Sequence, residues 1–303
     1  MARGRREGPA TAAPSWPALS AAGARDEQAR MPFVYAGRPV GSVARAHLAL
    51  LRAQAPWLVE RAGALHGEAV GDAALAALHA RLREAGAIVA WRDELFPLFD
   101  PATLEPLARI ERAAARFWGT LTLGAHANGY VRGADGRPSH LWIARRSPLK
   151  ATDPNLLDNL VGGGVPAGQT PREALVREGF EEAGLAPARM AAAVHAGALG
   201  LERDIREGFQ QEWLYVFDLE LPAGVEPRNQ DGEVAEFHLL PVDEVADVVA
   251  CTEAMTTDAA LVTIDFLLRH GLLGRLGAEG VAALQRRVDA RRVHSGPAAP
   301  GGR

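Results

Sequence analysis

The spacing of apolar positions after Met31 predicts a small domain that mixes strands and helices. The segment MPFVYAGRPVGSV shows the alternation typical of two short strands around a glycine turn. Helical spacing follows in three places: over residues 44–51, from Asp72 to Ala85, and from Leu104 to Phe117. We therefore expect a small α+β N-terminal domain over residues 31–118.

The pattern changes after Gly119 to longer stretches of strand-like alternation. LTLGAHANGYVR and HLWIARR are expected to pair as a hairpin, followed by strands at LDNLVGG, 192–201, 212–221 and EVAEFHLL. Helical spacing occurs at Pro171–Ala183, after Pro241, and at Asp258–His270. A mixed sheet with helices on both faces, an α/β/α layered domain, is therefore expected over residues 119–285.

The two ends of the sequence differ from the rest in composition. Residues 1–30 are rich in Ala, Arg, Pro and Gly and lack the apolar core of a secretory signal peptide. We expect a disordered extension there, with an Arg-rich transit peptide as a second interpretation and Met31 as an alternative start. A flexible tail is expected over residues 286–303, which end in HSGPAAPGGR.

Charge and cysteine content restrict the class of partner and the compartment. The formal net charge is -4 and the isoelectric point is about 6.2, so we expect no nucleic acid and no membrane surface as partner. The apolar stretch 259–268 is interrupted by Thr263 and Asp265 and is too short to span a bilayer. Because Cys251 is the single cysteine, no disulfide can form within the chain, and a cytoplasmic location is expected.

The helix expected at Pro171–Ala183 has clear start and stop signals. Thr170 is expected to cap it in a capping box with Glu173, and Gly184 is expected to end it. At about 100° per residue, one face of this helix carries three acids: Glu178, Glu181 and Glu182. The opposite, apolar face is expected to carry Val176, Gly179, Phe180 and Ala183.

Three neighbouring carboxylates repel one another unless a cation offsets their charge. Mg2+ prefers oxygen ligands and is commonly held by one or two carboxylates together with substrate phosphates. Two such ions can bridge a diphosphate and activate water for in-line attack. An ordinary amphipathic helix would also place charges opposite its apolar stripe. The glycine-rich run before the helix favours a binding site, because backbone without side chains can approach a ligand closely: Gly162, Gly163, Gly164 and Gly168.

Residues 162–185, GGGVPAGQTPREALVREGFEEAGL, resemble a Nudix box, in which G, five residues, E and seven residues precede R-E-U-x-E-E-x-G-U. The positions that match in register are Gly163, Arg177, Glu178, Glu181, Glu182, Gly184 and Leu185. The resemblance implies a Nudix α/β/α sandwich and a Mg2+-dependent hydrolase, with Mn2+ as an alternative metal. It also implies that Glu178, Glu181 and Glu182 bind metal, that Glu178 activates water, and that Arg177 orients the glutamates.

Two positions depart from the box. Gln169 stands where a glutamate is expected, which removes one anionic contact to a metal. Gly179 stands where a bulky apolar residue is expected, at a cost in helix propensity of about 1 kcal/mol relative to Ala. We interpret Gly179 as a position of close packing between the helix and a strand.

Sequence outside the box resembles a narrower group of Nudix proteins that carry an extra N-terminal domain. The matching segments, spread over residues 31–275, are WRDELFPLFD, IERAAARFWGT, AHANGYV, LDNLVGGGVPAG, NQDGEV and IDFLLRHG. This group is related to the Nudix region that is fused to thiamine pyrophosphokinase in some fungi. The resemblance implies hydrolysis of thiamine diphosphate, or of its oxo and oxy analogues, to the monophosphate. The kinase part is absent from this sequence.

Other residues are candidates for supporting roles. Glu233 and Glu236 are alternative positions for a fourth metal carboxylate, and solvated loop acids are the competing interpretation. A phosphate group would be neutralised by cations, for which the candidates are Arg145, Arg146 and Lys150. Asp158 and Asn159 are candidates for contacting a substrate ring. We interpret His126 and His140 as hairpin residues, and Trp91, Phe96 and Phe99 as core residues.

Three further functions remain open at this point. The protein would act on ADP-ribose or NADH as a nucleoside-diphosphate type of Nudix pyrophosphatase, or it would bind a diphosphate without turning it over. It would alternatively be an isomerase of prenyl diphosphates, although Cys251 lies far from the glycine-rich run. The sequence determines neither the group attached to the diphosphate, nor the number of metals, nor the oligomeric state.

Overall fold

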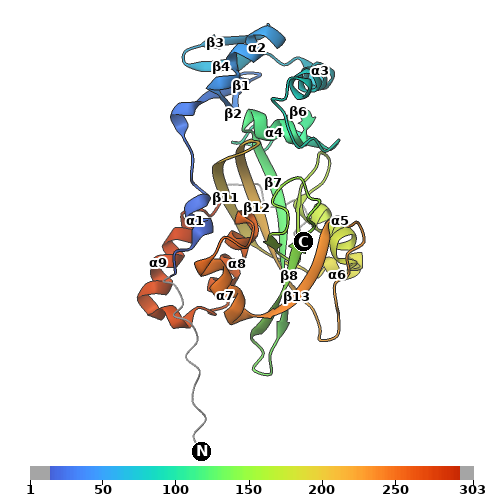
Figure 1. Cartoon of the computed structure of the whole chain (residues 1–303), viewed down its shortest axis with the longest axis vertical. Helices are drawn as coiled ribbons and strands as arrows, with labels where there is room; N and C mark the ends of the chain where they lie inside the picture. The colour runs from blue at the N-terminus through green and yellow to red at the C-terminus, as the bar shows by residue number, and fades with distance from the viewer. Residues whose placement is uncertain (1–13, 294–303) are drawn as a thin grey trace, which may run out of the picture.

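The computed structural model describes residues 14–293, and its N-terminal part is a small sheet covered by helices (Figure 1). The sheet has the strand order β2-β1-β4-β3, with β1 parallel to β4 and the other pairs antiparallel. Its elements are β1 (Arg30–Tyr35), β2 (Arg38–Ala44), α2 (Leu48–Gln54), β3 (Leu58–Arg61), β4 (Ala64–Gly67) and α3 (Gly71–Glu84). The predicted strand pair and the first two predicted helices are thus present.

The third predicted helix, Leu104–Phe117, is wrong in its first half. Residues Pro106–Glu111 form β6, which pairs with β5 (Leu95–Phe99), and α4 begins only at Arg112 and ends at Trp118. Ala108 and Ile110 are buried and Arg109 between them is exposed, which is the alternation of a strand. The Glu111 side chain then accepts a hydrogen bond from the Ala113 amide and starts α4.

The second part is built on a seven-stranded mixed sheet. Its main strand order is β11-β12-β7-β8-β13, with β10 added to β7 and β9 added to β8. Strands β7 and β12 run parallel, and the remaining pairs are antiparallel. The strands are β7 (Leu121–Arg132), β8 (Pro138–Arg146), β9 (Leu157–Asp158), β10 (Val161–Gly164), β11 (Val194–Ile205), β12 (Gly208–Glu220) and β13 (Val234–Pro241).

Helices cover both faces of this sheet, which confirms the predicted α/β/α layering (Figure 1). One face packs on α5 (Pro171–Ala183) and α6 (Pro187–Met190) through Leu121, Leu123 and Ala125 of β7. The other face packs on α7 (Val242–Cys251), α8 (Thr257–Arg269) and α9 (Gly277–Asp289). None of the helices within residues 14–293 is long and apolar enough to cross a bilayer.

Both predicted disordered ends are partly wrong. Residues 14–30 include α1 (Pro17–Ala21), and Trp16 and Leu19 are buried in the same core as α8. At the other end, α9 continues to Asp289, and the Val293 amide donates to the Ala198 carbonyl at 3.0 Å. Burial of a few large apolar side chains outweighs the local Ala, Pro and Arg content. The remainder of both predictions, residues 1–13 and 294–303, lies outside the described residues.

The close packing predicted for Gly179 is present, but its partner is a helix and not a strand. A Cβ atom on Gly179 would lie 2.5 Å from Sδ and 2.6 Å from Cγ of Met190, in α6. Met190 is fully buried and cannot move aside freely. We expect Gly179→Ala to lower the free energy of unfolding by about 1–3 kcal/mol despite the better helix propensity of alanine. Thermal denaturation measures this change, and a melting temperature equal to or above that of the wild type would contradict it.

Candidate active site

Helix α5 is fixed at both ends by the signals found in the sequence. Thr170 Oγ1 accepts from the Glu173 amide at 3.2 Å, and Glu173 Oε2 accepts from the Thr170 amide at 2.8 Å. Gly184 ends the helix in the left-handed conformation, with φ of 64°. The predicted capping box is therefore complete, and it fixes the residue at which α5 begins.

The acids do not share one solvent-facing side of α5. Only 7% of the Glu182 side chain and 12% of the Glu178 side chain are exposed, against 41% for Glu181. Phe180, expected on the packed face, is instead exposed. The helix lies against β10, so that Glu178 and Glu182, one turn apart, point inward at the sheet edge.

The glycines of β10 make room for these carboxylates. The Gly162 amide donates to Glu182 Oε2 at 3.1 Å. A Cβ atom on Gly163 would lie 2.5 Å from the Glu178 carboxyl carbon, closer than real contacts allow. Any side chain at Gly163 would therefore displace Glu178, which gives the glycine-rich run a direct structural role beside the acids.

Arg177 holds Glu178 and Glu181 in place. Its Nη2 donates to Glu178 at 2.9 Å and its Nη1 donates to Glu181 at 2.7 Å. Its Nε donates to Gln169 Oε1 at 3.3 Å, so the residue that departs from the box supports the arginine instead of offering a carboxylate. These contacts give Arg177 an orienting role of the kind that the resemblance implied.

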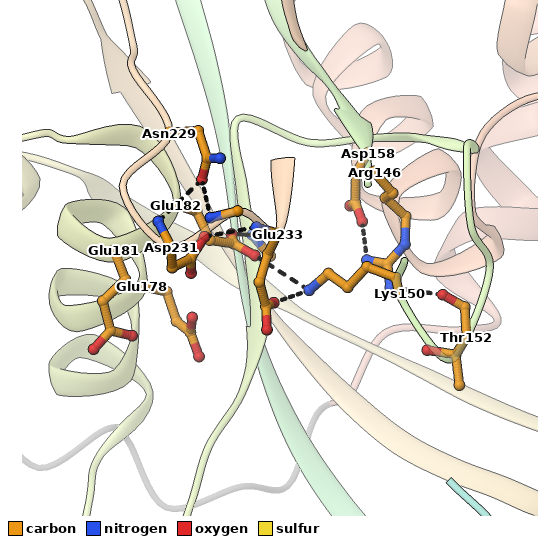
Figure 2. A network of polar contacts seen from close by, with 12 residues as sticks. Arg146, Lys150, Thr152, Asp158, Glu178, Glu181, Glu182, Asn229, Asp231 and Glu233 are labelled. Atoms are coloured by element: carbon orange, nitrogen blue, oxygen red, sulfur yellow. Dashed lines mark hydrogen bonds and ion pairs between the residues drawn. The ribbon is translucent and has the colours of Figure 1, made fainter. Parts of the chain in front are cut away.

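Lys150 lies between Glu182 and Glu233 (Figure 2). Its Nζ is 3.8 Å from Glu182 Oε1 and also forms an ion pair with Glu233 Oε2. The loop before β13 brings Glu233 there, together with Asp231 and Asn229 (Figure 2). The ammonium group thus bridges two acids that sequence reasoning assigned to a metal.

Burial and mutual repulsion raise the pKa of both Glu178 and Glu182. Burial, then the charges of Glu178 and Asp158, raise the pKa of Glu182 to about 8, although Lys150 lies nearby. Burial also raises the pKa of Glu178, against the opposing effect of Arg177. Burial and the neighbouring acids thus destabilise the charged forms of Glu178 and Glu182.

The four predicted metal ligands, Glu178, Glu181, Glu182 and Glu233, are not gathered into one cluster. Within residues 14–293, no three Asp, Glu, His or Cys side chains lie close enough together to enclose a metal ion. Glu181 is turned to Arg177 and Glu233 to Lys150, whereas Glu178 and Glu182 stay at the glycine strand. Glu236, the alternative fourth acid, is 60% exposed and lies 4.0 Å from Arg145.

In the metal-free protein, we expect the free energy of unfolding to fall as the pH rises from about 5 to 8. The unfolded chain releases the Glu182 proton near the ordinary glutamate pKa of about 4.3, whereas the folded chain keeps it until the pKa of about 8. Between these values the folded state binds more protons, so a higher pH favours unfolding. Glu182→Gln should remove most of this slope, on the order of a few kcal/mol across the window. Urea unfolding in EDTA at several pH values measures it, and an unchanged slope in the variant would refute this origin.

A cleft of about 540 Å³ adjoins the acids and β10. Its walls come from both parts of the chain: α4 and the segment before β5 on one side, and β10, the β11–β12 turn and the start of α8 on the other. Gly162, Gly163 and Gly164 line it, so the carboxylates of α5 and the cleft meet at the same glycine strand.

Six arginines line this cleft, and three of them influence one another's charge: Arg92, Arg112 and Arg146. Arg146 Nη1 donates to Asp158 Oδ2 at 2.8 Å, and Arg112 Nη1 donates to Glu94 Oε2 at 2.9 Å. Burial, and then the charges of Arg112 and Arg146, lower the pKa of Arg92. Such mutual repulsion is relieved by an anion with several oxygens, because guanidinium groups bind phosphates through planar forks.

Two of these arginines were not foreseen, and one predicted cation lies elsewhere. Arg92 and Arg112 belong to the N-terminal part and reach the cleft only through its packing on the sheet. Arg145, a predicted phosphate contact, does not line the cleft; its Nη1 donates to the Asn155 carbonyl at 3.1 Å. Arg146 lines the cleft, and Lys150 lies in the carboxylate network.

The remaining predicted residues divide between the cleft and the core. Asp158 lines the cleft, whereas Asn159 is buried and donates to Thr263 Oγ1 at 3.1 Å. His126, interpreted as an ordinary hairpin residue, is buried on β7 and lines the cleft. Strand alternation was the available signal, because His126 faces away from Ala125 and Ala127, which pack on α5.

Comparisons with known proteins agree with this arrangement of elements. The sequence profile of the NUDIX domain matches residues 122–259. Nudix hydrolase 24, chloroplastic, from Arabidopsis thaliana is 42% identical over 67% of this chain. Nudix hydrolase 20, chloroplastic, from the same plant is 41% identical over 63% of this chain. The chain spans about half the length of these relatives, 55% and 51%.

Among solved structures, DR0079 from Deinococcus radiodurans is 26% identical, with a TM-score of 0.42, and the match covers 56% of this chain and 97% of that one. The profile match spans the seven-stranded sheet from β7 to β13, the glycine strand β10 and the acid-bearing helix α5. Residues 122–259 of this chain therefore match the NUDIX domain.

Proposed function

We propose that this protein hydrolyses the diphosphate linkage of a small organic diphosphate in a reaction that depends on a divalent metal. The observation that carries the proposal is the position of Glu178 and Glu182, buried against the glycines of β10 at the edge of an arginine-lined cleft. Carboxylates for metal and guanidinium groups for phosphate are thereby placed side by side, which is what cleavage of a diphosphate requires.

The acids fit a hard divalent cation, Mg2+ with Mn2+ as the alternative. Their donors are all carboxylate oxygens, the ligand type that such cations prefer. Glu181 and Glu233 would complete the set by exchanging Arg177 and Lys150 for the metal. A bound cation would supply charge withdrawal from phosphorus and a lower pKa for water.

The side chains of the chain itself have distinct roles in this proposal. Glu178 takes the proton from the water that attacks phosphorus, and Arg177 keeps its carboxylate in position. Arg92, Arg112 and Arg146 hold the phosphate oxygens and stabilise the charge that develops on them. The bond between the bridging oxygen and the attacked phosphorus breaks, and the remaining monoester leaves.

We propose thiamine diphosphate, or its oxo and oxy analogues, as the substrate class. The support is the sequence resemblance of residues 31–275 to Nudix proteins related to the region fused to thiamine pyrophosphokinase. The structure adds that Arg92 and Arg112 of the N-terminal part line the cleft, so this part would contribute to substrate selection. The alternative substrates are ADP-ribose and NADH.

A substrate panel tests this proposal. Purified protein with Mg2+ is incubated with thiamine diphosphate, oxothiamine diphosphate, ADP-ribose and NADH, and kcat/KM is determined for each from product chromatography. The expected result is the highest kcat/KM for a thiamine-type compound and no turnover in EDTA. A preference for ADP-ribose or NADH would reject the thiamine assignment while leaving the hydrolase in place.

A non-catalytic, diphosphate-sensing module is the second candidate, because Gln169 replaces a carboxylate of the box. A sensor would bind the same compounds in calorimetry without consuming any of them over hours. The hydrolase remains our proposal because Glu178, Glu181 and Glu182 are all retained.

We also propose a cytoplasmic location and small-molecule ligands, as the single cysteine and the net charge of -4 indicate. The two plant relatives are both named as chloroplastic. Fractionation of the source cells distinguishes the two compartments.

A further inference from the structure

The cleft contains a second charged group that takes no part in the proposed hydrolysis. Glu212 of β12, Asp258 of α8, Gln210 of β12 and His126 of β7 line it together, and we call these four residues the acidic floor. Parallel pairing of β12 with β7, and packing of α8 on this face of the sheet, bring them together from distant parts of the sequence.

Gln210 fixes the two carboxylates relative to each other. Its Nε2 donates to Glu212 Oε2 at 2.8 Å and to Asp258 Oδ2 at 2.9 Å, so both amide hydrogens are used. Arg116 Nη2 also donates to Glu212 Oε2, at 2.7 Å. Gln210 is only 3% exposed, so its side chain cannot easily move, and it keeps Glu212 and Asp258 in place.

One polar atom of the acidic floor is buried without a hydrogen bond among the described residues. Asp258 Oδ1 is buried and unpartnered, and the nearest guanidinium, that of Arg203, is 3.9 Å away. Glu212 Oε1 receives no hydrogen bond from Gln210 or Arg116, which both contact Oε2. His126 uses Nδ1 to contact Asn159 at 3.0 Å, which leaves Nε2 for the cleft.

A buried, unpaired oxygen such as Asp258 Oδ1 is costly unless a partner arrives. Burial, and then the charge of Glu212, raise the pKa of Asp258, although Arg203 opposes them. For Glu212, burial raises the pKa, but Arg116 and Gln210 outweigh it and lower the pKa. A flat ring with N–H donors or a positive charge would satisfy Asp258 Oδ1.

We propose that the acidic floor binds a nitrogen heterocycle that carries N–H donors or a positive charge, as the specificity site of the cleft. The assignment deepens the proposed function, because the same ligand would place its diphosphate at Arg92, Arg112 and Arg146. The arginines and the acidic floor line one cleft of about 540 Å³, and such a volume is typical of a site for one small ligand. A site built to pair with ring N–H groups rejects analogues that lack them.

Binding measurements on the full chain test this assignment without requiring turnover. Isothermal titration in EDTA uses two probes: thiamine monophosphate, which has an amino group and a cationic ring, and inorganic pyrophosphate, which has no ring. Asp258→Asn and Glu212→Gln are each expected to weaken thiamine monophosphate binding about tenfold or more, because a hydrogen bond to a charged group is lost. Pyrophosphate binding should stay within about twofold, since the arginines are unchanged.

Glu244→Gln, which removes one acid from the exposed side of α7, is the matched control and should leave both affinities unchanged. Thermal denaturation of each variant separates lost binding from lost folding; Asp258→Asn keeps the Arg116–Glu212 ion pair if Glu212→Gln proves unstable. Equal losses for both probes, or no loss for thiamine monophosphate in a folded variant, would overturn the assignment.

The substrate panel separates failure of this assignment from failure of the proposed function. Thiamine diphosphate hydrolysis with unchanged ring binding in the variants would reject the acidic floor alone. Ring binding that is lost in the variants, with no diphosphate hydrolysed by the wild type, would reject the hydrolase alone.

Discussion

Glu178→Gln is expected to lower kcat for diphosphate hydrolysis about a thousandfold while the protein stays folded. The amide has the size of the carboxylate but cannot accept the proton of the attacking water, and a positioned general base typically contributes about 10²–10⁴-fold. The Glu178 carboxylate accepts a hydrogen bond from Arg177 at 2.9 Å and lies directly against the backbone of Gly163, which has no side chain. Single-turnover kinetics at saturating Mg2+ measure the chemical step directly.

Gly163→Ala and Glu279→Gln provide the comparison for that result. Alanine at 163 keeps the Glu178 carboxyl group but displaces it, because the new Cβ would lie 2.5 Å from the carboxyl carbon, so a large loss of kcat is expected here too. Glu279, exposed on α9, should be replaceable without effect. If Glu178→Gln retains more than about a tenth of wild-type kcat, Glu178 is not the base.

Arg112→Met is expected to lower kcat/KM about a hundredfold. Arg112 lines the cleft, and a Cβ atom on Gly164 of β10 would lie 3.5 Å from its Cζ. Its removal takes away a fixed donor for the charge that develops on phosphate oxygens, an effect of about 10²–10³ in comparable sites. Methionine preserves the apolar stem that packs on Phe96, where the guanidinium lies 5.2 Å from the ring centroid.

Arg109→Met is the matched control for this substitution. It removes an arginine from the adjacent strand β6, where Arg109 pairs with Asp72 and does not line the cleft. The control should keep kcat/KM within about twofold, as a surface ion pair contributes little. Equal effects of the two substitutions would show that Arg112 acts through stability of the N-terminal part and not through phosphate.

Local sequence signals predicted the parts of the site that depend on residues close together in the sequence. Thr170, Glu173 and Gly184 defined α5, whereas the single strand expected at LDNLVGG is divided into β9 and β10. The direction in which the acids of α5 point could not be predicted from the sequence, because a helical wheel does not show that α5 lies against β10. Phe180 was placed on the packed side and is exposed, whereas Glu182 is buried.

Residues brought in by tertiary packing were beyond the reach of sequence patterns. Arg112 follows a strand that resembled part of a helix, and it reaches the cleft only because α4 packs on β12. Glu212 and Asp258 meet through Gln210 although they are 46 positions apart in number, 258 less 212. Lys150 was expected at phosphate, but it pairs with Glu233 and lies 3.8 Å from Glu182, which are distant from it in sequence.

Phosphorus NMR of thiamine diphosphate with the intact chain and Mg2+ tests the central claim most directly. The account predicts that the two diphosphate resonances disappear and that signals of thiamine monophosphate and inorganic phosphate replace them. The same sample with EDTA, or with Glu178→Gln, should keep the diphosphate resonances for many times longer. Equal rates of loss with and without metal, or in wild type and Glu178→Gln, would contradict metal-dependent hydrolysis at the acids of α5.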